Sequence, residues 1–387
     1  MANMIDYLDW RGDLSFKADS LNPVDNLVFA RLSYIDFSDA LSGGETLKSL
    51  ATRYLPSEEK VTPGVLLNEG TKELLEAAGL SKRFGSVILK NYESKLDLDR
   101  ELQFSAMTFE IDDKTAYVVF RGTDDTLVGW KEDFNMSFMD VVPAQKEASR
   151  YLNGVLKKHN YKTVYVGGHS KGGNLAIYSA VHLNRKFKSR LIQVFNNDGP
   201  GFKQSIIDRE EYQDVADRIV TLIPQSSIVG LLLESGNNYK VVQSTVKGIM
   251  QHEGLSWEVM GKDFVYLPKL RRDAVIIDRT TKGMLEKMSM EQREAFSTVL
   301  FDLITVNDSK TLTDIDKGGL GSFFKMSENF RRLDRETKKV IIETLSLFFD
   351  EGYKSFIQVT ELNQWQGKFK KWREEVKGEI EGFWNKF

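Results

Sequence analysis

The sequence predicts an α/β fold in which helices flank a mostly parallel sheet, with a helical region at the C-terminal end. In the middle of the chain, short apolar runs alternate with amphipathic stretches long enough for helices. This alternation favours βαβ units and hence a parallel sheet. All seven prolines lie at or before residue 268. Because a proline in a helix interior costs about 3 kcal/mol, the rest of the chain is free to form long helices.

The expected strands are short runs rich in β-branched and aromatic residues, and the expected helices have apolar residues at helical spacing. In chain order we expect a helix at 45–54, strands at 86–89 and 115–120, a helix at 144–158, a strand at 163–166, a helix at 174–183, and strands at 191–195 and 219–223. Helices between successive strands are the connections that a parallel sheet requires.

The proline-free end of the chain is expected to form several packed helices. Apolar residues recur at helical spacing in 296–303 and again in 340–348, and glycines between 318 and 321 mark a break. We therefore divide the chain into two regions. Residues 1–269 form the α/β core, with an N-terminal extension and a candidate lid around 40–100, and residues 270–387 form the helical region.

Composition narrows the function classes. The 387 residues are 41% hydrophobic and 28% charged, which is typical of a globular protein. The net charge of −3 argues against a basic nucleic-acid binder. The chain has no cysteine, which excludes disulfides, thiolate metal sites and cysteine nucleophiles. It also has no Walker, EF-hand, HExxH or GxGxxG motif, so we expect neither a metal nor an organic cofactor.

Membrane segments are not expected. The beginning of the chain lacks a basic segment followed by an apolar stretch, and no run of about 18 apolar residues occurs, so we expect a cytoplasmic protein. A short basic cluster at 368–373 is followed by glutamates. A basic amphipathic helix can touch a membrane surface, but the interleaved acidic residues favour a solvated helix face.

One motif carries chemistry. Residues 168–172, Gly-His-Ser-Lys-Gly, form a G-x-S-x-G between an expected strand and an expected helix. A nucleophile elbow needs this context, because its serine adopts a strained turn conformation and its glycines tolerate close approach of neighbouring backbone. A glycine-rich turn that binds phosphate at a helix N-terminus would give the same local pattern. We favour the elbow, with Ser170 as the nucleophile.

A serine nucleophile needs a base, and it needs an acid that orients the base. In α/β-hydrolases the order along the chain is Ser, then Asp or Glu, then His. Of the four histidines, only His182 and His252 follow Ser170. We expect His182 to lie on the helix after the motif and to point away from the site. His252 lies in an expected loop, so we assign it as the base, with a surface-loop histidine as the alternative. We interpret His169 as structural.

A second segment resembles a known family. Residues 118–126, Val-Val-Phe-Arg-Gly-Thr-Asp-Asp-Thr, are followed by Trp130 and Asp133. They resemble the third-strand segment of class 3 lipase-like α/β-hydrolases, which precedes a G-H-S-x-G elbow by some tens of residues. This resemblance covers about residues 100–260. It implies an α/β-hydrolase fold and a lipase-like acyl hydrolase.

The whole chain further resembles a bacterial domain-of-unknown-function family within the same superfamily. The segments that carry this resemblance include Leu-Ser-Tyr-Ile-Asp-Phe at 32–37, Asn-Asp-Gly-Pro-Gly at 197–201 and Gln-His-Glu at 251–253. It extends the similarity to the N-terminal part of the chain.

The triad acid is assigned to a different strand from the one that the resemblance implies. In the lipase-like family the acid usually follows the strand that corresponds to 219–223, where this chain has Gln-Ser-Ser at 225–227 and no carboxylate. Some α/β-hydrolases carry their acid after the preceding strand, where Asp198 satisfies the required chain order. We assign Asp198, with Glu234 or a solvent-linked Ser227 as alternatives. An Asp-Gly turn whose carboxylate caps backbone amides would have the same sequence.

An acyl-transfer site also needs donors for the developing oxyanion. The amide of Lys171, the residue after the serine, is one expected donor. The resemblance implies Thr123, through its amide or its hydroxyl, as the other. We expect the Lys171 side chain either to form an outward salt bridge or to project over the site, where it would favour acidic substrates.

These residues predict a serine hydrolase of the esterase or lipase type, acting on a small-molecule acyl or lipid-like substrate, with no nucleic-acid partner. Ser170 attacks the acyl carbonyl, His252 takes its proton and Asp198 orients His252. The alternative is a catalytically inactive hydrolase fold that serves as a binding or regulatory protein. The missing carboxylate after 219–223 motivates that alternative, since a fold does not establish a function.

Overall fold

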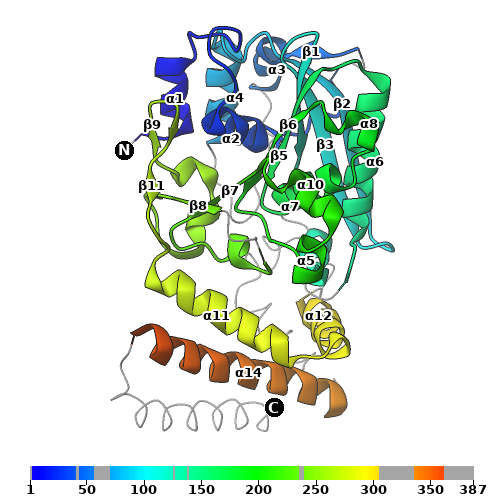
Figure 1. Ribbon diagram of the computed structural model, residues 1–387, viewed down its shortest axis with the longest axis vertical. Helices are drawn as coiled ribbons and strands as arrows, with labels where there is room; N and C mark the ends of the chain where they lie inside the picture. The colour runs from blue at the N-terminus through cyan, green and yellow to red at the C-terminus, as the bar shows by residue number, and fades with distance from the viewer. Residues whose placement is uncertain are drawn as a thin grey trace. The chain divides into compact units, whose positions relative to one another are not determined.

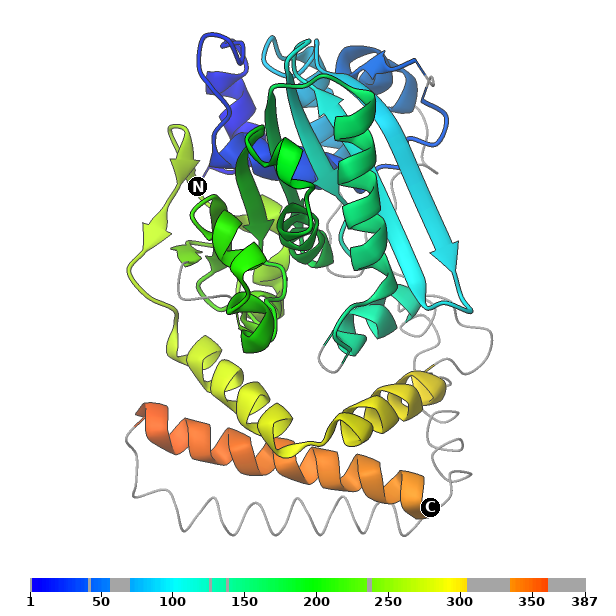
Figure 2. The same ribbon diagram turned by 45° about the vertical axis from the view of Figure 1, so that its right-hand side comes forward.

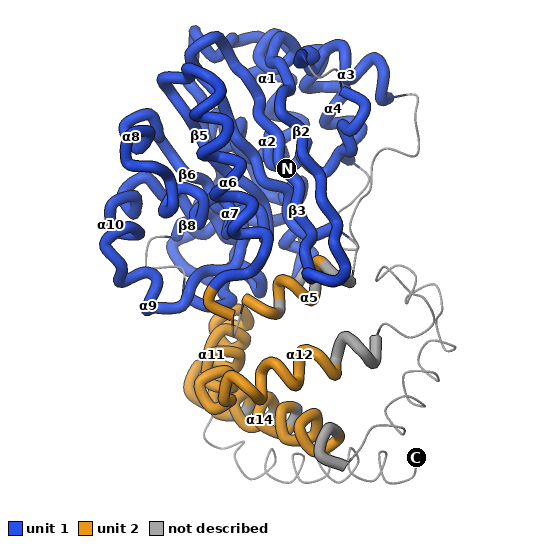
Figure 3. The backbone as a smooth tube through the Cα atoms, turned by 90° about the vertical axis from the view of Figure 1, so that its right-hand side faces the viewer, with its two compact units in different colours: residues 1–124, 141–270 blue, residues 125–140, 271–387 orange. Residues whose placement is uncertain are grey.

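The computed structural model describes residues 2–40, 43–55, 70–124, 127–136, 139–234, 239–304 and 335–360. The chain divides into two compact units (Figure 3). Unit 1 comprises residues 1–124 and 141–270, and unit 2 comprises residues 125–140 and 271–387. Unit 2 therefore includes a short segment from the middle of the chain, which no pattern in the sequence indicated.

Unit 1 is built around a nine-stranded sheet with the order β1-β2-β3-β4-β5-β6-β7-β8-β11. The strands are β1 (Glu45–Thr46), β2 (Ile88–Asp97), β3 (Leu102–Glu110), β4 (Thr115–Phe120), β5 (Thr163–His169), β6 (Leu191–Asn197), β7 (Ile219–Pro224), β8 (Tyr239–Val242) and β11 (Tyr266–Leu267). Strands β4 to β8 pair in parallel. The pairs from β1 to β4, and the pair of β8 with β11, are antiparallel. The predicted α/β fold class is confirmed (Figure 1).

Helices cover both faces of this sheet. They are α1 (Met4–Arg11), α2 (Pro23–Leu32), α3 (Leu47–Tyr54), α4 (Thr71–Leu80), α6 (Pro143–Lys158), α7 (Lys171–Val181), α8 (Arg185–Lys188), α9 (Gln204–Ile207) and α10 (Glu210–Ala216). The loops after β7 hold short 3-10 helices, η1 (Val229–Leu231), η2 (Gly248–His252) and η3 (Gly254–Ser256), and a small hairpin of β9 (Val259–Met260) with β10 (Asp263–Phe264).

The side chains of β4 show why two helical layers form. Tyr117 and Val119 belong to a buried cluster with α1 to α4, whereas Val118 and Phe120 belong to a second cluster with α6 and α7. Successive side chains of a strand point to opposite faces, and both faces are buried here, so the run is apolar throughout. Helix α6 lies along the sheet beside β3 (Figure 2).

Helix α2 is fixed at its beginning. The Asn22 side chain accepts hydrogen bonds from the Val24 and Asp25 amides, and Asp25 accepts one from the Asn22 amide, which forms a capping box. Pro23 occupies the first helical turn, where it needs no acceptor. Asp25 also pairs with Arg83 at 2.5 Å, and both side chains are fully buried. Breaking a buried pair costs about 3–5 kcal/mol, so this contact holds the helix firmly.

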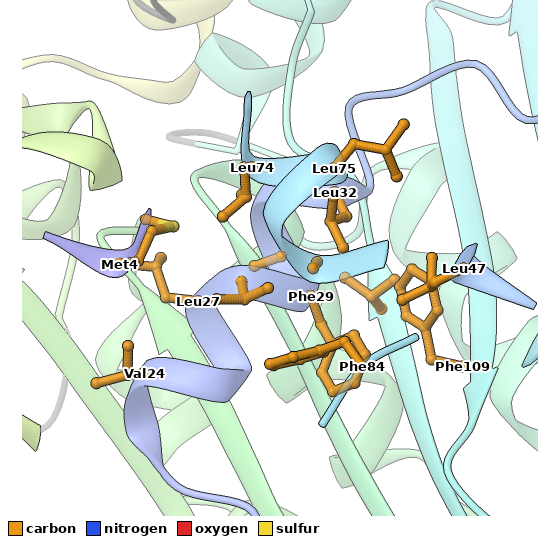
Figure 4. Close-up of a cluster of buried hydrophobic side chains, with 14 of the residues drawn as sticks. Met4, Val24, Leu27, Phe29, Leu32, Leu47, Leu74, Leu75, Phe84 and Phe109 are labelled. Atoms are coloured by element: carbon orange, nitrogen blue, oxygen red, sulfur yellow. The ribbon is translucent and has the colours of Figure 1, made fainter. Parts of the chain in front are cut away.

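The middle of α2 packs into the first buried cluster (Figure 4). The ring of Phe29 lies 4.8 Å from that of Phe109, 4.9 Å from that of Tyr117 and 5.1 Å from that of Phe84, measured between centroids. Aromatic pairs at such distances add about 0.5–1.5 kcal/mol to the stabilisation from burial. The helix is thus bound tightly to the sheet beneath it.

Most expected elements are present with shifted bounds. The strand at 115–120 has the expected bounds, and those beginning at 163, 191 and 219 extend further than expected. The helix expected at 45–54 begins at Leu47, because the two residues before it pair with β2 as β1. The strand expected at 86–89 is the start of β2, which forms a long hairpin with β3 that we did not predict.

The region proposed as a lid, around 40–100, contributes β1, α3, α4 and β2 among its described residues. Leu47, Leu50, Leu74 and Leu75 of the two helices lie in the first buried cluster. A lid role for this region stays a prediction.

Unit 2 is helical, as expected for the C-terminal region. Its described helices are α5 (Leu127–Asn135), α11 (Arg272–Lys287), α12 (Met290–Ile304) and α14 (Arg335–Thr360). Helix α11 packs against α14, where Lys287 forms an ion pair with Glu351. The expected glycine break at 318–321 and the basic cluster at 368–373 lie outside the described residues. Within the part of the chain that the structure describes, no helix could cross a membrane.

Candidate active site

The G-x-S-x-G motif forms a sharp turn between β5 and α7. Strand β5 ends at His169, helix α7 begins at Lys171, and Ser170 between them has φ +57° and ψ −134°. This is the strained backbone expected for the motif. A Cβ atom on Gly172 would lie 2.1 Å from the Phe120 carbonyl oxygen, and one on Gly168 would lie 2.3 Å from the Gly172 carbonyl carbon. Only glycine lets the end of β4 and the start of α7 approach each other this closely.

The ends of β4 and β6 lie on either side of Ser170. A Cβ atom on Gly122, just after β4, would lie 3.0 Å from the Ser170 Cβ. On the other side, the Ser170 amide donates to the Asn197 carbonyl at 2.9 Å, and a Cβ on Gly199 would lie 2.2 Å from the Ser170 carbonyl oxygen. The serine itself is only 8% exposed. It therefore lies where the carboxyl ends of three parallel strands meet, which is where α/β sheets bind ligands.

Asp198 contacts His252 directly. The Nδ1 atom of His252 lies 2.7 Å from Oδ2 of Asp198, and both side chains are buried. The other carboxylate oxygen accepts hydrogen bonds from the Ser227 hydroxyl at 2.5 Å and from the Gly230 amide at 3.1 Å. The carboxylate is therefore fixed on both sides. Since a carboxylate only accepts, His252 carries its proton on Nδ1, which leaves Nε2 as the basic nitrogen.

The alternative acids do not occupy this position. Glu234 pairs through its backbone with Phe202 in an isolated bridge. Ser227 holds Asp198 rather than replacing it. After β7, the amide nitrogen of the Gln225 side chain donates to the Ser244 carbonyl. Asp198 has φ +52°, so a strained turn after β6 aims the carboxylate at His252.

His252 lies at the end of η2 in a loop that is tied to its surroundings. The Trp257 indole donates to the Gln251 carbonyl at 2.8 Å, and the Ser226 amide donates to the Gln251 side chain at 2.9 Å. The Trp257 side chain is fully buried. Both residues that flank the histidine, Gln251 and Glu253, are also buried. These contacts order the loop and hold His252 in one position.

His169 joins this loop to the elbow. Its Nε2 lies 2.7 Å from the His252 carbonyl oxygen, so Nε2 carries the proton and donates. Its Nδ1 then accepts from the Tyr34 hydroxyl at 3.0 Å. The His169 and His252 rings lie 4.4 Å apart between centroids. His169 is thus a buried connector, as the structural interpretation expected.

The structure brings Asp198 and His252 together and places His252 beside the elbow. No hydrogen bond between the Ser170 hydroxyl and His252 occurs among those of the described residues. Contacts of this kind in active sites often tighten only when the substrate binds. His182 lies at the end of α7, where its Nδ1 bonds to the Tyr178 carbonyl at 2.9 Å.

The two expected oxyanion donors come from different elements beside Ser170. Lys171 follows the serine in the chain, and Thr123 lies in the segment after the neighbouring strand β4. Lys171 is the first residue of α7, so the helix itself does not use its amide. Thr123 follows Gly122, the residue that approaches Ser170. The expectations for the Lys171 side chain were wrong, because it is fully buried and its Nζ donates to the carbonyl and side-chain oxygens of Gln103 at 3.0 and 2.6 Å. Those acceptors come from β3, 68 residues away, and no local pattern reveals them.

Two features of the site have roles that the sequence did not suggest. Ser227 was considered only as a substitute acid, and it proves to be the partner of Asp198. Tyr34 lies in a segment singled out only for its resemblance to a family, and it proves to bond His169. Among the described residues, no cluster of histidine and carboxylate side chains could hold a metal ion.

We expect His169 to reduce the stability of the protein in acid. Burial, and after it the neighbouring His252, holds the pKa of His169 well below its usual value of 6.5. As the pH falls through about 6.5, the unfolded chain binds a proton that the folded protein does not. The free energy of unfolding should therefore fall by up to about 1.4 kcal/mol per pH unit below that point.

Urea unfolding between about pH 7.5 and 5.5, with wild type and His169→Gln, measures this contribution. The variant should be less stable at every pH but should lose part of the pH dependence. If the free energy of unfolding depended on pH equally in the two proteins, that result would contradict the assignment of a neutral His169.

Comparison with known proteins gives one family and several partial structural matches. A family model described as Mbeg1-like matches residues 78–302, more than half of the chain. No curated protein matches the chain. The native Rhizomucor miehei lipase propeptide complex matches at 20% identity over 41% of this chain and 57% of that chain, with a TM-score of 0.30.

Two further lipase structures match to a similar degree. Lipase II from Rhizopus niveus matches at 16% identity over 62% of this chain and 83% of that chain, with a TM-score of 0.33. The M37 lipase matches at 15% identity over 53% of this chain and 68% of that chain, with a TM-score of 0.34.

Proposed function

The chain belongs to the Mbeg1-like family, a lipase-like family, and on that basis and on the geometry of the site we propose that it is a serine hydrolase acting on carboxylic esters. The observation that carries the proposal is the 2.7 Å contact of Asp198 with His252 beside a strained Ser170. A buried carboxylate on one ring nitrogen is what a catalytic histidine requires. The order along the chain, Ser then Asp then His, is that of α/β-hydrolases.

In the proposed mechanism, the Ser170 hydroxyl attacks the acyl carbonyl while Nε2 of His252 removes its proton. Asp198 stabilises the imidazolium that forms and keeps the proton on Nδ1. The amides of Lys171 and Thr123 donate to the oxyanion of the tetrahedral intermediate. His252 then gives its proton to the leaving alcohol, and water releases the acyl group by the same steps in reverse order.

The position of Asp198 weakens the case for the binding or regulatory alternative. It rested on the absence of a carboxylate after 219–223. Asp198, after β6, bonds His252 instead, with Ser227 and Gly230 fixing its other oxygen. This supports the catalytic proposal over the alternative.

The proposed substrate class is a small-molecule acyl or lipid-like ester. Hydrolysis of p-nitrophenyl esters of increasing acyl length tests the activity and orders the acyl preference. We expect His252→Gln to reduce kcat/KM by about 10³-fold or more, because general acid–base catalysis contributes about 10²–10⁴-fold and the oriented histidine serves both half-reactions. The matched control is His182→Gln, since the His182 ring bonds the Tyr178 carbonyl at the opposite end of α7 from Ser170, and it should stay within about twofold.

A folded wild-type protein that hydrolyses no ester of the series would overturn the proposed function. A His182→Gln effect as large as that of His252→Gln would show instead that the loss is not specific to the site.

A further inference from the structure

Helix α2 and the turn after it contact three segments of the site: the end of β6, the loop after η2 and the end of β5. Each contact falls on a residue next to a member of the proposed triad in the chain. Asn26 bonds Asn197, which precedes Asp198; Arg31 bonds Glu253, which follows His252; and Tyr34 bonds His169, which precedes Ser170. All six side chains that make these contacts are buried.

The first contact is a reciprocal amide pair. Nδ2 of Asn26 donates to Oδ1 of Asn197 at 2.8 Å, and Nδ2 of Asn197 donates back to Oδ1 of Asn26 at 3.1 Å. The Asn197 amide group also donates to the Gly168 carbonyl at 2.9 Å, and the Asn197 carbonyl accepts from the Ser170 amide. Asn26 thereby fixes the end of β6 and the end of β5 together. The turn that carries Asp198 starts from this point.

The second contact is a buried ion pair. Nε of Arg31 lies 3.0 Å from Oε1 of Glu253, and the two side chains are 1% and 4% exposed. The same carboxylate oxygen accepts from the Leu255 amide, so it also caps η3. A buried charge pair in good geometry tolerates little displacement, because separating the charges leaves each one unsolvated. Arg31 therefore fixes the loop one residue beyond His252.

The third contact passes through His169. The Tyr34 hydroxyl donates to Nδ1 of His169, and Nε2 of His169 donates to the His252 carbonyl at 2.7 Å. The Tyr34 hydroxyl also lies against Gly122, where an added Cβ would approach it to 2.3 Å. One phenol thus touches the segment that precedes Thr123 and fixes the imidazole that joins the elbow to the His252 loop.

We propose that residues 23–34 act as a positioning element for the hydrolytic site, with Asn26, Arg31 and Tyr34 as positioning residues. This inference rests on the proposed function and extends it to side chains that do not touch the substrate. The capping box, the Asp25–Arg83 pair and the Phe29 packing hold the element rigid against the sheet. Catalytic geometry must hold to within about half an ångström, and about 1 Å of misplacement can cost 10²-fold in rate.

The test measures the kinetics of phosphonylation by a fluorophosphonate probe, separating the inactivation rate constant from the probe's dissociation constant. Tyr34→Phe removes one hydroxyl and keeps the ring, and Arg31→Lys keeps the charge but alters the contact with Glu253. We expect each to lower the inactivation rate constant about tenfold or more while the dissociation constant stays within about twofold. A lost positioning contact slows the reaction without weakening the binding of the probe.

The matched control is Tyr151→Phe. The Tyr151 hydroxyl is also buried and bonds to Thr108 and to the Asn91 carbonyl, and neither belongs to the site. Tyr151→Phe should lower the free energy of unfolding in urea about as much as Tyr34→Phe does, and it should react with the fluorophosphonate at about the wild-type rate. Two variants are used so that a failure of either to fold leaves the other to decide.

The outcomes separate the two proposals. If wild type reacts and the folded Tyr34→Phe or Arg31→Lys protein reacts as fast as Tyr151→Phe, the positioning role is overturned and the hydrolase proposal stands. If the folded wild-type protein does not react at all, the hydrolase proposal is overturned, and the positioning role is overturned with it.

Discussion

Ser170→Ala should reduce kcat/KM for an activated ester by about 10⁴-fold or more, the largest effect that we expect from any substitution. Removing the nucleophile of a triad removes the covalent route, and only the oxyanion hole and substrate binding remain. Among the described residues the Ser170 hydroxyl has no hydrogen-bond partner, so the substitution should change the free energy of unfolding by less than about 1 kcal/mol.

Ser179→Ala is the matched control for this substitution. Ser179 lies on α7, is fully buried and donates its hydroxyl to the Ala176 carbonyl at 2.9 Å. The control should keep activity within about twofold while losing about 1 kcal/mol of stability. The assay is steady-state ester hydrolysis by both variants at matched folded fraction. Activity that survives in Ser170→Ala would exclude this serine as the nucleophile.

Asp198→Asn should reduce kcat by about 10⁴-fold while the substrate still binds. An amide in place of the carboxylate can present N–H to Nδ1 of His252 and so favour the tautomer whose Nε2 carries the proton. That histidine cannot accept the proton of Ser170. The Ser227 hydroxyl and the Gly230 amide hold the other oxygen in place, so we expect the geometry of the turn to be kept.

Glu234→Gln provides the comparison for Asp198→Asn. Glu234 was the other carboxylate considered from the sequence, and it pairs with Phe202 through its backbone. The two variants are compared by kcat and KM on one ester at several pH values. A kcat for Asp198→Asn within about tenfold of wild type would remove this residue from the triad, and a large loss in Glu234→Gln would transfer the role.

Local patterns predicted the centre of the fold better than its edges. The strands β4 to β7 are mostly buried and each contains a short apolar run, which a single sequence reveals. The β2–β3 hairpin was not predicted, because β2 has the sequence Ile-Leu-Lys-Asn-Tyr-Glu-Ser-Lys-Leu-Asp and is only partly buried. Its pairing with β3 also contains a register shift between Lys90 and Glu93. A half-exposed, irregular strand has no clean period of two.

The parts of the site that lie close in sequence were also the easier ones to predict. The elbow is a local strand–turn–helix pattern, and Asp198 comes directly after an expected strand and satisfies the chain order of a triad, as Glu234 also does. Its partner Ser227 lies 29 residues away, and Tyr34 lies 135 residues from His169. Such contacts depend on the packing of separate elements, and no periodicity or motif records them.

The environment of the Lys171 side chain also depends on a contact that is distant in sequence. A lysine after a nucleophile reads as a solvent-facing or substrate-facing cation. The structure instead turns it inward to Gln103, whose side-chain amide donates to Asp124 at 3.3 Å. Burying an ammonium group costs free energy unless several acceptors surround it, and here β3 supplies them. The Lys171 side chain therefore connects the elbow to β3, whose Gln103 contacts Asp124, the residue after Thr123.

The most direct test of the account is to treat the folded protein with a fluorophosphonate and measure its intact mass. We predict one adduct per chain in wild type, located on Ser170 by peptide mapping, and none in Ser170→Ala. Asp198→Asn should react far more slowly. No adduct on folded wild type, or an adduct that persists in Ser170→Ala, would contradict the claim that this site holds an activated serine.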